Sequence, residues 1–415
     1  MKTALVAGAA VAFPAIARAT VVAPSERITL GVIGLGPRCQ FVLRSMLEEP
    51  DLQCLAVCDV QASRRELGKK IVDDKYGNTD CATYRDFREL LARPDIDATL
   101  IATGENWHAL AAVLAAQAGK DIYCEKPCAM TITECRILDE TIHRYSRVFQ
   151  TGTQRRSISN FRLAVHLARS GKLGKLRRLH ASVYDPLARH EWLPAEPEPP
   201  REQLDWDMWI GPAPWRPYNS RYVTGRGWQG FADFTAGANL MDWGVHTVDL
   251  CQWANDADGT APLEYEPAQD KIVARYANGV ILELNYGRRV PQQSRSNLGA
   301  APIRFEGDEG WVETGDTGVV EVHPPSLRGE LRRLTQQSGI DVGNHVRNFL
   351  DCIRTRAQPN ASSRIMRCSH LACFAAAIAW QLNRKVVLDP VTETFPGDSE
   401  ANRLRFRAYR EPWRL

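Results

Sequence analysis

The sequence carries no excess of charge of either sign. Its 415 residues include 52 Lys and Arg against 49 Asp and Glu, which gives a formal net charge of +3 at pH 7. A protein that binds nucleic acid needs a strongly basic face to contact the phosphates. The near balance of charge therefore argues against a nucleic-acid partner and is typical of a globular protein.

The cysteines lack the pattern of a metal site or a disulfide framework. None of the eleven forms a CxxC pair, and none lies in a His/Cys cluster with the spacing of zinc ligands. Several, such as Cys54, Cys58 and Cys124, stand inside apolar runs. There cysteine acts as a small hydrophobic residue. We therefore predict no metal.

Long apolar runs are also missing, except at the N-terminus. Residues 4–17 are apolar, follow Lys2, and lead to the tripeptide ARA at 17–19, which fits an A-x-A cleavage pattern. The run is too short and too rich in small residues for a membrane span. We predict an export leader over residues 1–27 of a periplasmic or secreted protein without a membrane partner. A disordered tail on a cytoplasmic protein is the alternative.

The length of the chain implies two domains. Between residues 28 and 152, short β-rich runs such as Ile28–Ile33 alternate with helical segments. Such alternation implies right-handed βαβ units. We therefore predict an α/β domain over residues 28–152, with a doubly wound parallel sheet covered by helices on both faces.

Beyond residue 152 the strands come as hairpins. The run "DKIVARYANGVILELNYG" has an Asn278-Gly279 turn between two β-rich halves. The run "IRFEGDEGWVET" likewise has a turn, around residues 308–310, between two β-rich halves. Consecutive hairpins predict an α+β domain over residues 153–415 with an open, mainly antiparallel sheet. Two late helices, 344–356 and 365–382, either pack on this sheet or return to the first domain.

A glycine turn follows the first predicted strand. Gly34 and Gly36 let the backbone turn tightly and approach a pyrophosphate, which would then lie at a helix N-terminus. The third small residue of the fingerprint is Cys39. Asp59 ends the next strand, at the distance where an acid binds a ribose 2′-hydroxyl. These residues predict an NAD site.

Two arginines leave NADP open as the alternative cofactor. Arg64 and Arg65 follow Asp59 and could hold a 2′-phosphate. Solvated charges on the following helix are the interpretation that we favour for both.

The stretch "DIYCEKPCAM" places Glu125, Lys126 and Pro127 at the end of an apolar run. In a doubly wound sheet, ligands bind beyond the carboxyl ends of the strands. A lysine there can hydrogen-bond a substrate oxygen. A surface turn is the alternative interpretation of the same residues.

A later segment, "GANLMDWGVHTVDLCQWA", has helical spacing. Asp242 and His246 lie four residues apart, and Asp249 follows three further on, so the three share a face. A carboxylate beside an imidazole can fix its tautomer and make it a general base. A helix that buries a satisfied histidine is the alternative.

Three runs carry a resemblance to a known family: "GVIGLGPRC", "AVCDV" and "LIATGENWHALAAVLAAQAGKDIYCEKPCAMT". Together they resemble the Gfo/Idh/MocA family of nicotinamide oxidoreductases. The resemblance implies a Rossmann domain followed by an open antiparallel sheet that often forms an oligomer interface, here in a homodimer or homotetramer. Cys39 in place of a glycine, and Gly104 in place of a proline, depart from the family pattern.

The resemblance also implies the site residues. Lys126, Asp242 and His246 would form the catalytic group. Lys126 would hold the substrate oxygen, His246 would accept the proton, and Asp242 would contact or orient the substrate. The cofactor-binding residues would be Gly34, Gly36, Asp59, Thr103, His108, Glu125 and Lys126.

A Trp- and Pro-rich segment, residues 203–231, is the predicted substrate wall. Trp228 could stack on a sugar ring, and Arg155 and Arg156 follow the last strand of the first domain near the crevice. Asp249 joins this substrate set. The predicted activity is hydride transfer between NAD(P) and a secondary alcohol of a sugar, cyclitol or sugar derivative.

An NAD-dependent glycoside hydrolase or lyase that acts through a transient keto-sugar is the alternative activity. Retention of Lys126 favours the oxidoreductase.

Overall fold

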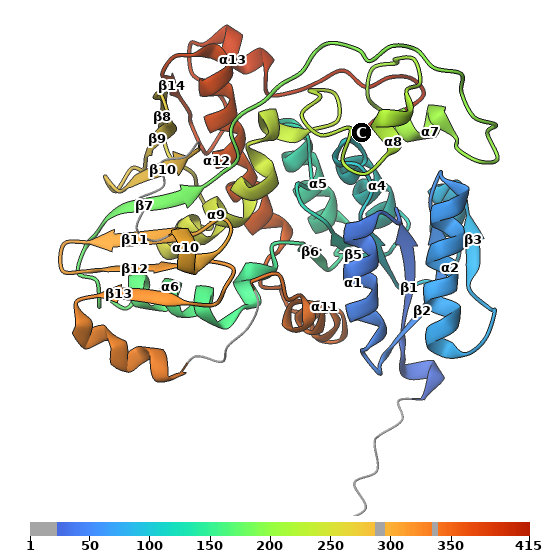
Figure 1. Cartoon of the computed structure of the whole chain (residues 1–415), viewed down its shortest axis with the longest axis horizontal. Helices are drawn as coiled ribbons and strands as arrows, with labels where there is room; N and C mark the ends of the chain where they lie inside the picture. The colour runs from blue at the N-terminus through green and yellow to red at the C-terminus, as the bar shows by residue number, and fades with distance from the viewer. Residues whose placement is uncertain (1–22, 287–294, 334–338) are drawn as a thin grey trace, which may run out of the picture.

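The computed structural model describes residues 23–286, 295–333 and 339–415. The predicted leader, residues 1–27, lies almost entirely outside the described residues. Two sheets lie side by side, one in each half of the chain (Figure 1). The expected division into an α/β half and an α+β half is therefore present.

The first sheet has six strands in the order β3-β2-β1-β4-β5-β6. All its pairs are parallel, and β1 and β4 meet where the strand order reverses. Such a switch point opens a crevice at the carboxyl ends of the strands. The strands are β1 (Ile28–Ile33), β2 (Leu52–Cys58), β3 (Ala82–Tyr84), β4 (Ala98–Ile101), β5 (Asp121–Cys124) and β6 (Phe149–Thr151).

Helices cover both faces of this sheet, as predicted. They are α1 (Pro37–Leu47), α2 (Ala62–Tyr76), α3 (Phe87–Leu91), α4 (Glu105–Gln117) and α5 (Ile132–Arg144). The strand β3, at the edge of the sheet, was not predicted from the sequence. Its three residues are half-buried or exposed, so their apolar signal is weak.

The second sheet has eight strands in the order β13-β12-β11-β7-β10-β9-β8-β14. Its pairs are antiparallel except that of β7 with β10, and both predicted hairpins are present. The strands are β7 (Leu176–Ser182), β8 (Glu264–Pro267), β9 (Lys271–Arg275), β10 (Ile281–Asn285), β11 (Ile303–Gly307), β12 (Trp311–Thr314), β13 (Val320–His323) and β14 (Val386–Val387).

Three helices pack on or beside the second sheet: α6 (Ser159–Arg169), α9 (Met241–Ala254) and α12 (Ser363–Leu382). Among the described residues, α12 is the one helix with the length and apolar character of a membrane span. It packs against α5 and α9, and most of its residues are buried. Its apolar character is therefore that of a core helix that joins the two halves.

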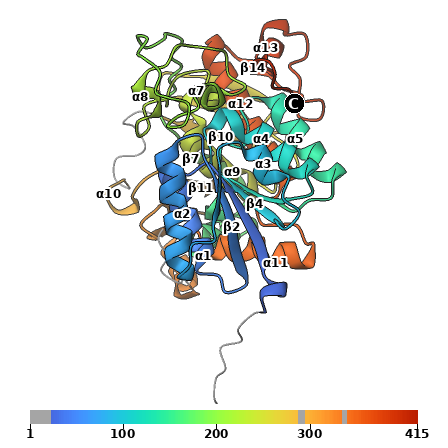
Figure 2. The same ribbon diagram turned by 90° about the vertical axis from the view of Figure 1, so that its right-hand side faces the viewer.

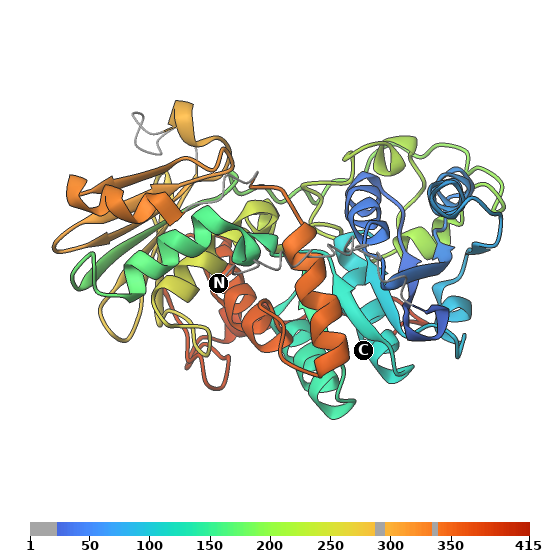
Figure 3. The same ribbon diagram turned by 90° about the horizontal axis from the view of Figure 1, so that it is seen from below.

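The late helix α11 (Gly343–Thr355) returns to the first domain. Its residues Val346, Phe349 and Leu350 share a buried cluster with Leu30 and Val32 of β1. Figure 3 shows this orange-red helix between the two sheets. The first structural unit thus includes a helix from beyond the predicted boundary at residue 152.

An arm of the second half crosses the crevice of the first sheet. The arm, residues 184–235, carries α7 (Trp206–Ile210) and α8 (Ser220–Val223), which lie above α1 and α2 in Figures 1 and 2. The Asp205 amide donates to the Val60 carbonyl, and the Ala62 amide donates to that of Gln203. The shorter elements are η1 (Pro24–Glu26), η2 (Gln154–Ser157), η3 (Ala236–Asn239), α10 (Arg295–Leu298), η4 (Pro325–Arg333) and α13 (Ser399–Arg403).

Candidate active site

A cavity of about 410 Å³ lies where the arm covers the carboxyl ends of the parallel strands. Both halves of the chain supply its walls, which is the arrangement expected of a ligand site at a switch point. Its lining includes Gly34, Gly36, Asp59, Thr103, His108, Glu125 and Lys126 from the first domain, and Trp209, Arg226, Trp228, Gln229 and Asp242 from the second.

The glycine turn has no room for a side chain at Gly34. Its φ is +84°, and an added Cβ would lie 2.7 Å from the Ala102 oxygen and the Thr103 nitrogen. Gly36 precedes α1, and a Cβ there would meet only Arg64 Nη1, at 3.9 Å. Because Pro37 starts the helix next to this open space, the N-terminus of α1 can take a pyrophosphate.

Asp59 braces the glycine turn. Its Oδ2 accepts a hydrogen bond from the Leu35 amide at 2.7 Å, and its Oδ1 accepts one from the Gln61 amide at 2.9 Å. Burial raises the pKa of Asp59, against the opposing charge of Arg64. The carboxyl group therefore lines the predicted cofactor site and also fixes the turn.

Arg64 and Arg65 are not the freely solvated charges that we expected. Both are half-buried, and Arg65 Nη1 donates to the Asp59 carbonyl at 2.6 Å. Arg64 lines the cavity, and its Nη2 lies 3.4 Å from the Val223 carbonyl of the arm. The arm explains the difference, because it covers this face of α2.

His108 presents an unoccupied ring nitrogen inside the site. Its Nδ1 lies 2.6 Å from the Pro127 carbonyl, which can only accept, so Nδ1 carries the proton. Burial lowers the pKa of His108, so the imidazole is neutral. Among the described residues, Nε2 is buried without a hydrogen-bond partner. A cofactor with a polar hydrogen would satisfy it.

Glu125 pairs with an arginine that the sequence analysis overlooked. Its Oε1 accepts from Arg38 Nε at 2.9 Å, and Arg38 also contacts Gln154 Oε1 at 3.3 Å. Gly152 makes this packing possible, because a Cβ there would lie 2.8 Å from the Glu125 carboxyl carbon. Glu125 thus holds Arg38 at the first turn of α1, where a pyrophosphate would lie.

Lys126 and Asp242 form an ion pair between the two halves of the chain. Lys126 Nζ donates to Asp242 Oδ1 at 2.5 Å and also to the Asp242 backbone carbonyl. Burial opposes ionisation of Asp242, but the charge and hydrogen bond of Lys126 lower its pKa. The structure therefore brings together two of the three predicted catalytic residues.

His246 lies one helical turn beyond Asp242 on α9 and is buried. Burial, together with the positive charges of Lys126, Arg155 and Arg38, lowers the pKa of His246 well below its usual value. Its Nδ1 has no hydrogen-bond partner within the described part of the chain. A neutral imidazole near Lys126 is a competent proton acceptor.

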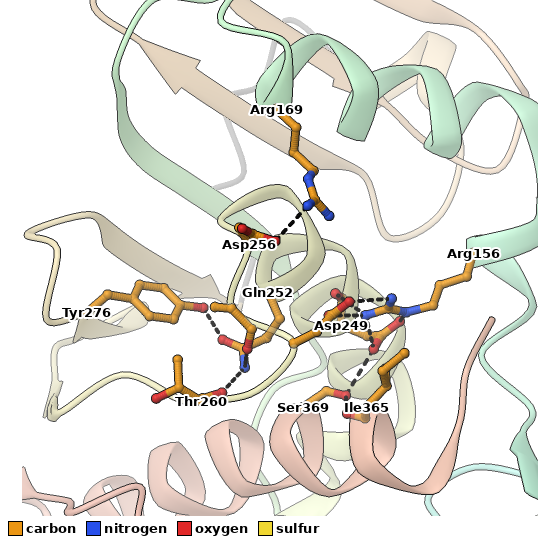
Figure 4. A network of polar contacts seen from close by, with 11 residues as sticks. Arg156, Arg169, Asp249, Gln252, Asp256, Thr260, Tyr276, Ile365 and Ser369 are labelled. Atoms are coloured by element: carbon orange, nitrogen blue, oxygen red, sulfur yellow. Dashed lines mark hydrogen bonds and ion pairs between the residues drawn. The ribbon is translucent and has the colours of Figure 1, made fainter. Parts of the chain in front are cut away.

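The expected carboxylate–imidazole pair is not the arrangement found. Asp242 pairs with Lys126, and Asp249 pairs with Arg156 through bonds of 2.6 and 2.9 Å (Figure 4). Both carboxylates are buried, and a buried carboxylate needs a cation more than a neutral ring. His246 therefore has no carboxylate partner from its own helix, and the charges that act on its pKa include those of Lys126, Arg155 and Arg38.

Arg156 and Asp249 belong to a structural network rather than to the cavity wall. Asp249 Oδ1 also accepts from Ser369 Oγ on α12, and Arg156 also pairs with Asp258. Arg155 is equally buried and pairs with Asp316 at 2.6 Å. None of the three lines the cavity, and Arg156 and Asp249 are engaged with other protein groups, while Arg155 Nε is buried without a hydrogen-bond partner among the described residues. Their contact with substrate therefore stays a prediction.

The predicted aromatic wall separates into two groups. Trp209 and Trp228 line the cavity, and Trp206 stacks on Trp209 from behind at 4.9 Å between ring centroids. Trp215 is 55% exposed on the surface. Trp228 therefore remains a candidate for contact with a sugar ring.

Glu105 is a site residue that the sequence analysis did not single out. It is the first residue of α4, lines the cavity, and accepts a hydrogen bond from the Ala236 amide at 2.7 Å. Burial raises the pKa of Glu105 to about 8, assisted by the charge of Asp242. The sequence did offer one indication of Glu105, because the residue directly follows Gly104, one of the two departures from the family pattern.

The C-terminal segment, residues 405–413, braces the first turn of α4. Arg407 donates to the Asn106 carbonyl at 2.9 Å, and the Trp413 ring meets that of Trp107 edge to face at 4.7 Å. Trp107 in turn donates to the Met208 carbonyl of α7. Because Trp107 and Met208 line the cavity, this segment supports its wall from behind.

A wider groove of about 1,310 Å³ runs between α5 and α12. It has charges of both signs, among them Asp139, Arg144 and Arg364. The glycine turn and Lys126 line the smaller cavity instead, so we assign the chemistry to that cavity.

Two family models match the chain. The model described as "Oxidoreductase family, NAD-binding Rossmann fold" matches residues 28–153. The model described as "Oxidoreductase family, C-terminal alpha/beta domain" matches residues 189–415. The second match alone covers more than half of the chain.

Individual relatives are more distant. Myo-inositol 2-dehydrogenase of Thermotoga maritima is 28% identical over 158 residues, which are 38% of this chain and 45% of that protein. A glycosyl hydrolase family 109 protein of Saccharopolyspora erythraea is 33% identical over 126 residues, 29% of this chain and 27% of that one. The matched part is thus less than half of the length of these curated relatives.

Solved structures share the fold. The WlbA dehydrogenase of Chromobacterium violaceum, crystallised with NADH and UDP-GlcNAcA, has a TM-score of 0.64 to this chain at 17% sequence identity. The superposition covers 88% of this chain and 96% of that structure. The similarity thus extends over both domains.

Proposed function

Because the chain belongs to the Gfo/Idh/MocA family of oxidoreductases, we propose that it transfers hydride between NAD and a secondary alcohol of a sugar, cyclitol or sugar derivative. Its first domain is an NAD-binding Rossmann domain. The observation that carries the proposal is the Lys126–Asp242 pair at the cavity that the glycine turn also lines.

The residues present fit a dinucleotide. Gly34 and Gly36 leave space at the N-terminus of α1, and Arg38 adds a positive charge beside it. Nε2 of His108 can accept a hydrogen bond, and no group among the described residues donates one to it. When bound, the nicotinamide accepts or supplies the hydride.

The protein's own groups handle the proton and the charge. Lys126 would donate a hydrogen bond to the substrate oxygen and stabilise negative charge on it. His246 would accept the hydroxyl proton, since its lowered pKa keeps it neutral and available. Asp242 would hold Lys126 in position through the contact at 2.5 Å.

The substrate class is proposed from the cavity wall and the relatives. Trp228 offers an apolar face for a sugar or cyclitol ring, and Gln229 and Arg226 offer donors for hydroxyl groups. The named dehydrogenase of Thermotoga maritima acts, by its name, on a cyclitol, which supports the same class here. We do not favour the glycoside-cleaving alternative.

One assay tests the proposal. The purified protein is incubated with NAD and a panel of cyclitols, free sugars and aryl glycosides. We expect net NADH formation with at least one cyclitol or sugar. Release of the aryl group without net NADH would refute the dehydrogenase and support glycoside cleavage.

A further inference from the structure

Glu105 connects the two halves of the chain at the active site. It is the first residue of α4, three residues separate it from the end of β4 at Ile101, and its side chain is buried. Its Oε2 accepts from the Ala236 amide of the second domain at 2.7 Å. The bond therefore crosses from the cofactor domain to the segment that leads into α9.

That segment has an unusual backbone. Gly237 and Ala238, within η3, both have left-handed conformations, with φ values of +54° and +52°. For Ala238 this conformation is unfavourable, so neighbouring contacts must hold it. The helix α9 starts at Met241, only three residues later, and carries Asp242 and His246. A change in the kink would therefore move both residues.

The charges around Glu105 come from three separate elements. Lys126 follows β5, Asp242 lies on α9, and Arg226 belongs to the arm; all three line the same cavity. An ionised Glu105 would compete with Asp242 for Lys126. A protonated Glu105 keeps its acceptor for the Ala236 amide and adds no charge.

We infer that Glu105 is a positioning residue for the proposed reaction, whose carboxyl group holds the Ala236 amide and so places α9 against Lys126. The effect of Glu105 on the reaction rate rests on the proposed function. The bond between Glu105 and Ala236 is independent of it.

Two variants at one position test the kinetic consequence. Glu105→Gln keeps an oxygen acceptor without a charge, whereas Glu105→Ala removes the acceptor. We expect Glu105→Ala to lower kcat about 100-fold while KM for NAD changes by less than about threefold. Glu105→Gln should restore most of kcat at neutral pH. The wild-type rate should fall as pH rises through about 8, and the glutamine variant should lack that fall.

Hydrogen exchange tests the positioning itself without any substrate. The amides of residues 236–240 should exchange faster in Glu105→Ala and at the wild-type rate in Glu105→Gln. Asp398→Ala is the control, because it removes a carboxyl group that accepts from the Ala401 amide, and neither residue lines the cavity. Unchanged exchange in Glu105→Ala overturns the inference even if the enzyme is active. A wild-type enzyme without dehydrogenase activity but with the expected exchange overturns only the proposed function.

Discussion

Lys126 and Asp242 form a buried ion pair on which the proposed chemistry of the site depends. Their side chains are only 14% and 8% exposed, so each charge needs the other. Two roles follow for the pair, one in stability and one in catalysis. Variants can separate these roles.

We predict that Lys126→Met lowers kcat by about 1,000-fold, because it removes the group that we propose donates a hydrogen bond to the reacting oxygen. The variant also leaves Asp242 without its cation, so the free energy of unfolding should fall by about 3 kcal/mol. The double variant with Asp242→Asn should recover the stability and stay inactive. Steady-state kinetics and thermal unfolding report the two effects, and an active double variant would contradict the assigned role.

The titration of His246 gives a second prediction. Burial, Lys126, Arg155 and Arg38 lower the pKa of His246 well below 6.5, so a general base here is already deprotonated at pH 6.5. Protonation of His246 should therefore slow alcohol oxidation only below pH 6.5. The free energy of unfolding should also decrease as pH falls, because the unfolded chain binds this proton more tightly than the folded chain does.

A pH–rate profile and acid unfolding curves of wild type and His246→Gln check this prediction. The variant should lose about 100- to 10,000-fold in rate and should lose less stability on acidification. An acid limb centred above pH 6.5 in the wild type would count against His246 as the base.

At the scale of helices and strands, the C-terminal segment supports the cofactor wall. Trp413 is buried against Trp107, and Trp107 bonds to Met208 of α7. We predict that Trp413→Ala lowers the thermal midpoint by about 5 °C and weakens NAD binding, because the cavity left behind loosens the first turn of α4. Trp192→Ala is the control, since Trp192 is 54% exposed. Equal midpoints for the two variants would contradict the bracing role.

The elements with strong local patterns were predictable from the sequence. The strand and glycine turn from Ile28 to Gly36 have a local sequence signature, and so does the turn at Asn278-Gly279. The Lys126 site was found because a strand end in a parallel sheet defines a position in space.

Other features depend on contacts between distant segments. The return of α11 to the first domain, at Val346 and Phe349, rests on packing that an amphipathic pattern alone does not assign. Arg155, Arg156 and Asp249 were expected to meet substrate because charge near a crevice suggests binding. Their actual partners, such as Asp316 and Asp258, come from other segments, so local sequence gave no sign of them.

The whole molecule is organised as two domains that close one cavity, and we propose that it works outside the cytoplasm as a homo-oligomer. We predict that a cell expressing the full chain exports it and removes the leader after the ARA motif at residues 17–19. A variant that lacks residues 1–27 should stay in the cytoplasm with the same specific activity. Cell fractionation and N-terminal mass analysis measure both outcomes, and an exported protein with an intact leader would contradict the cleavage site.

The C-terminal segment, residues 405–413, also has a fixed place in the order of synthesis. Residues 405–413 are synthesised after every residue that lines the cavity. A nascent chain on the ribosome therefore has the walls of the cavity before it has the support behind α4. We therefore expect the part of the wall that Trp107 and Met208 supply to become rigid later in synthesis than the glycine turn that lines the same cavity.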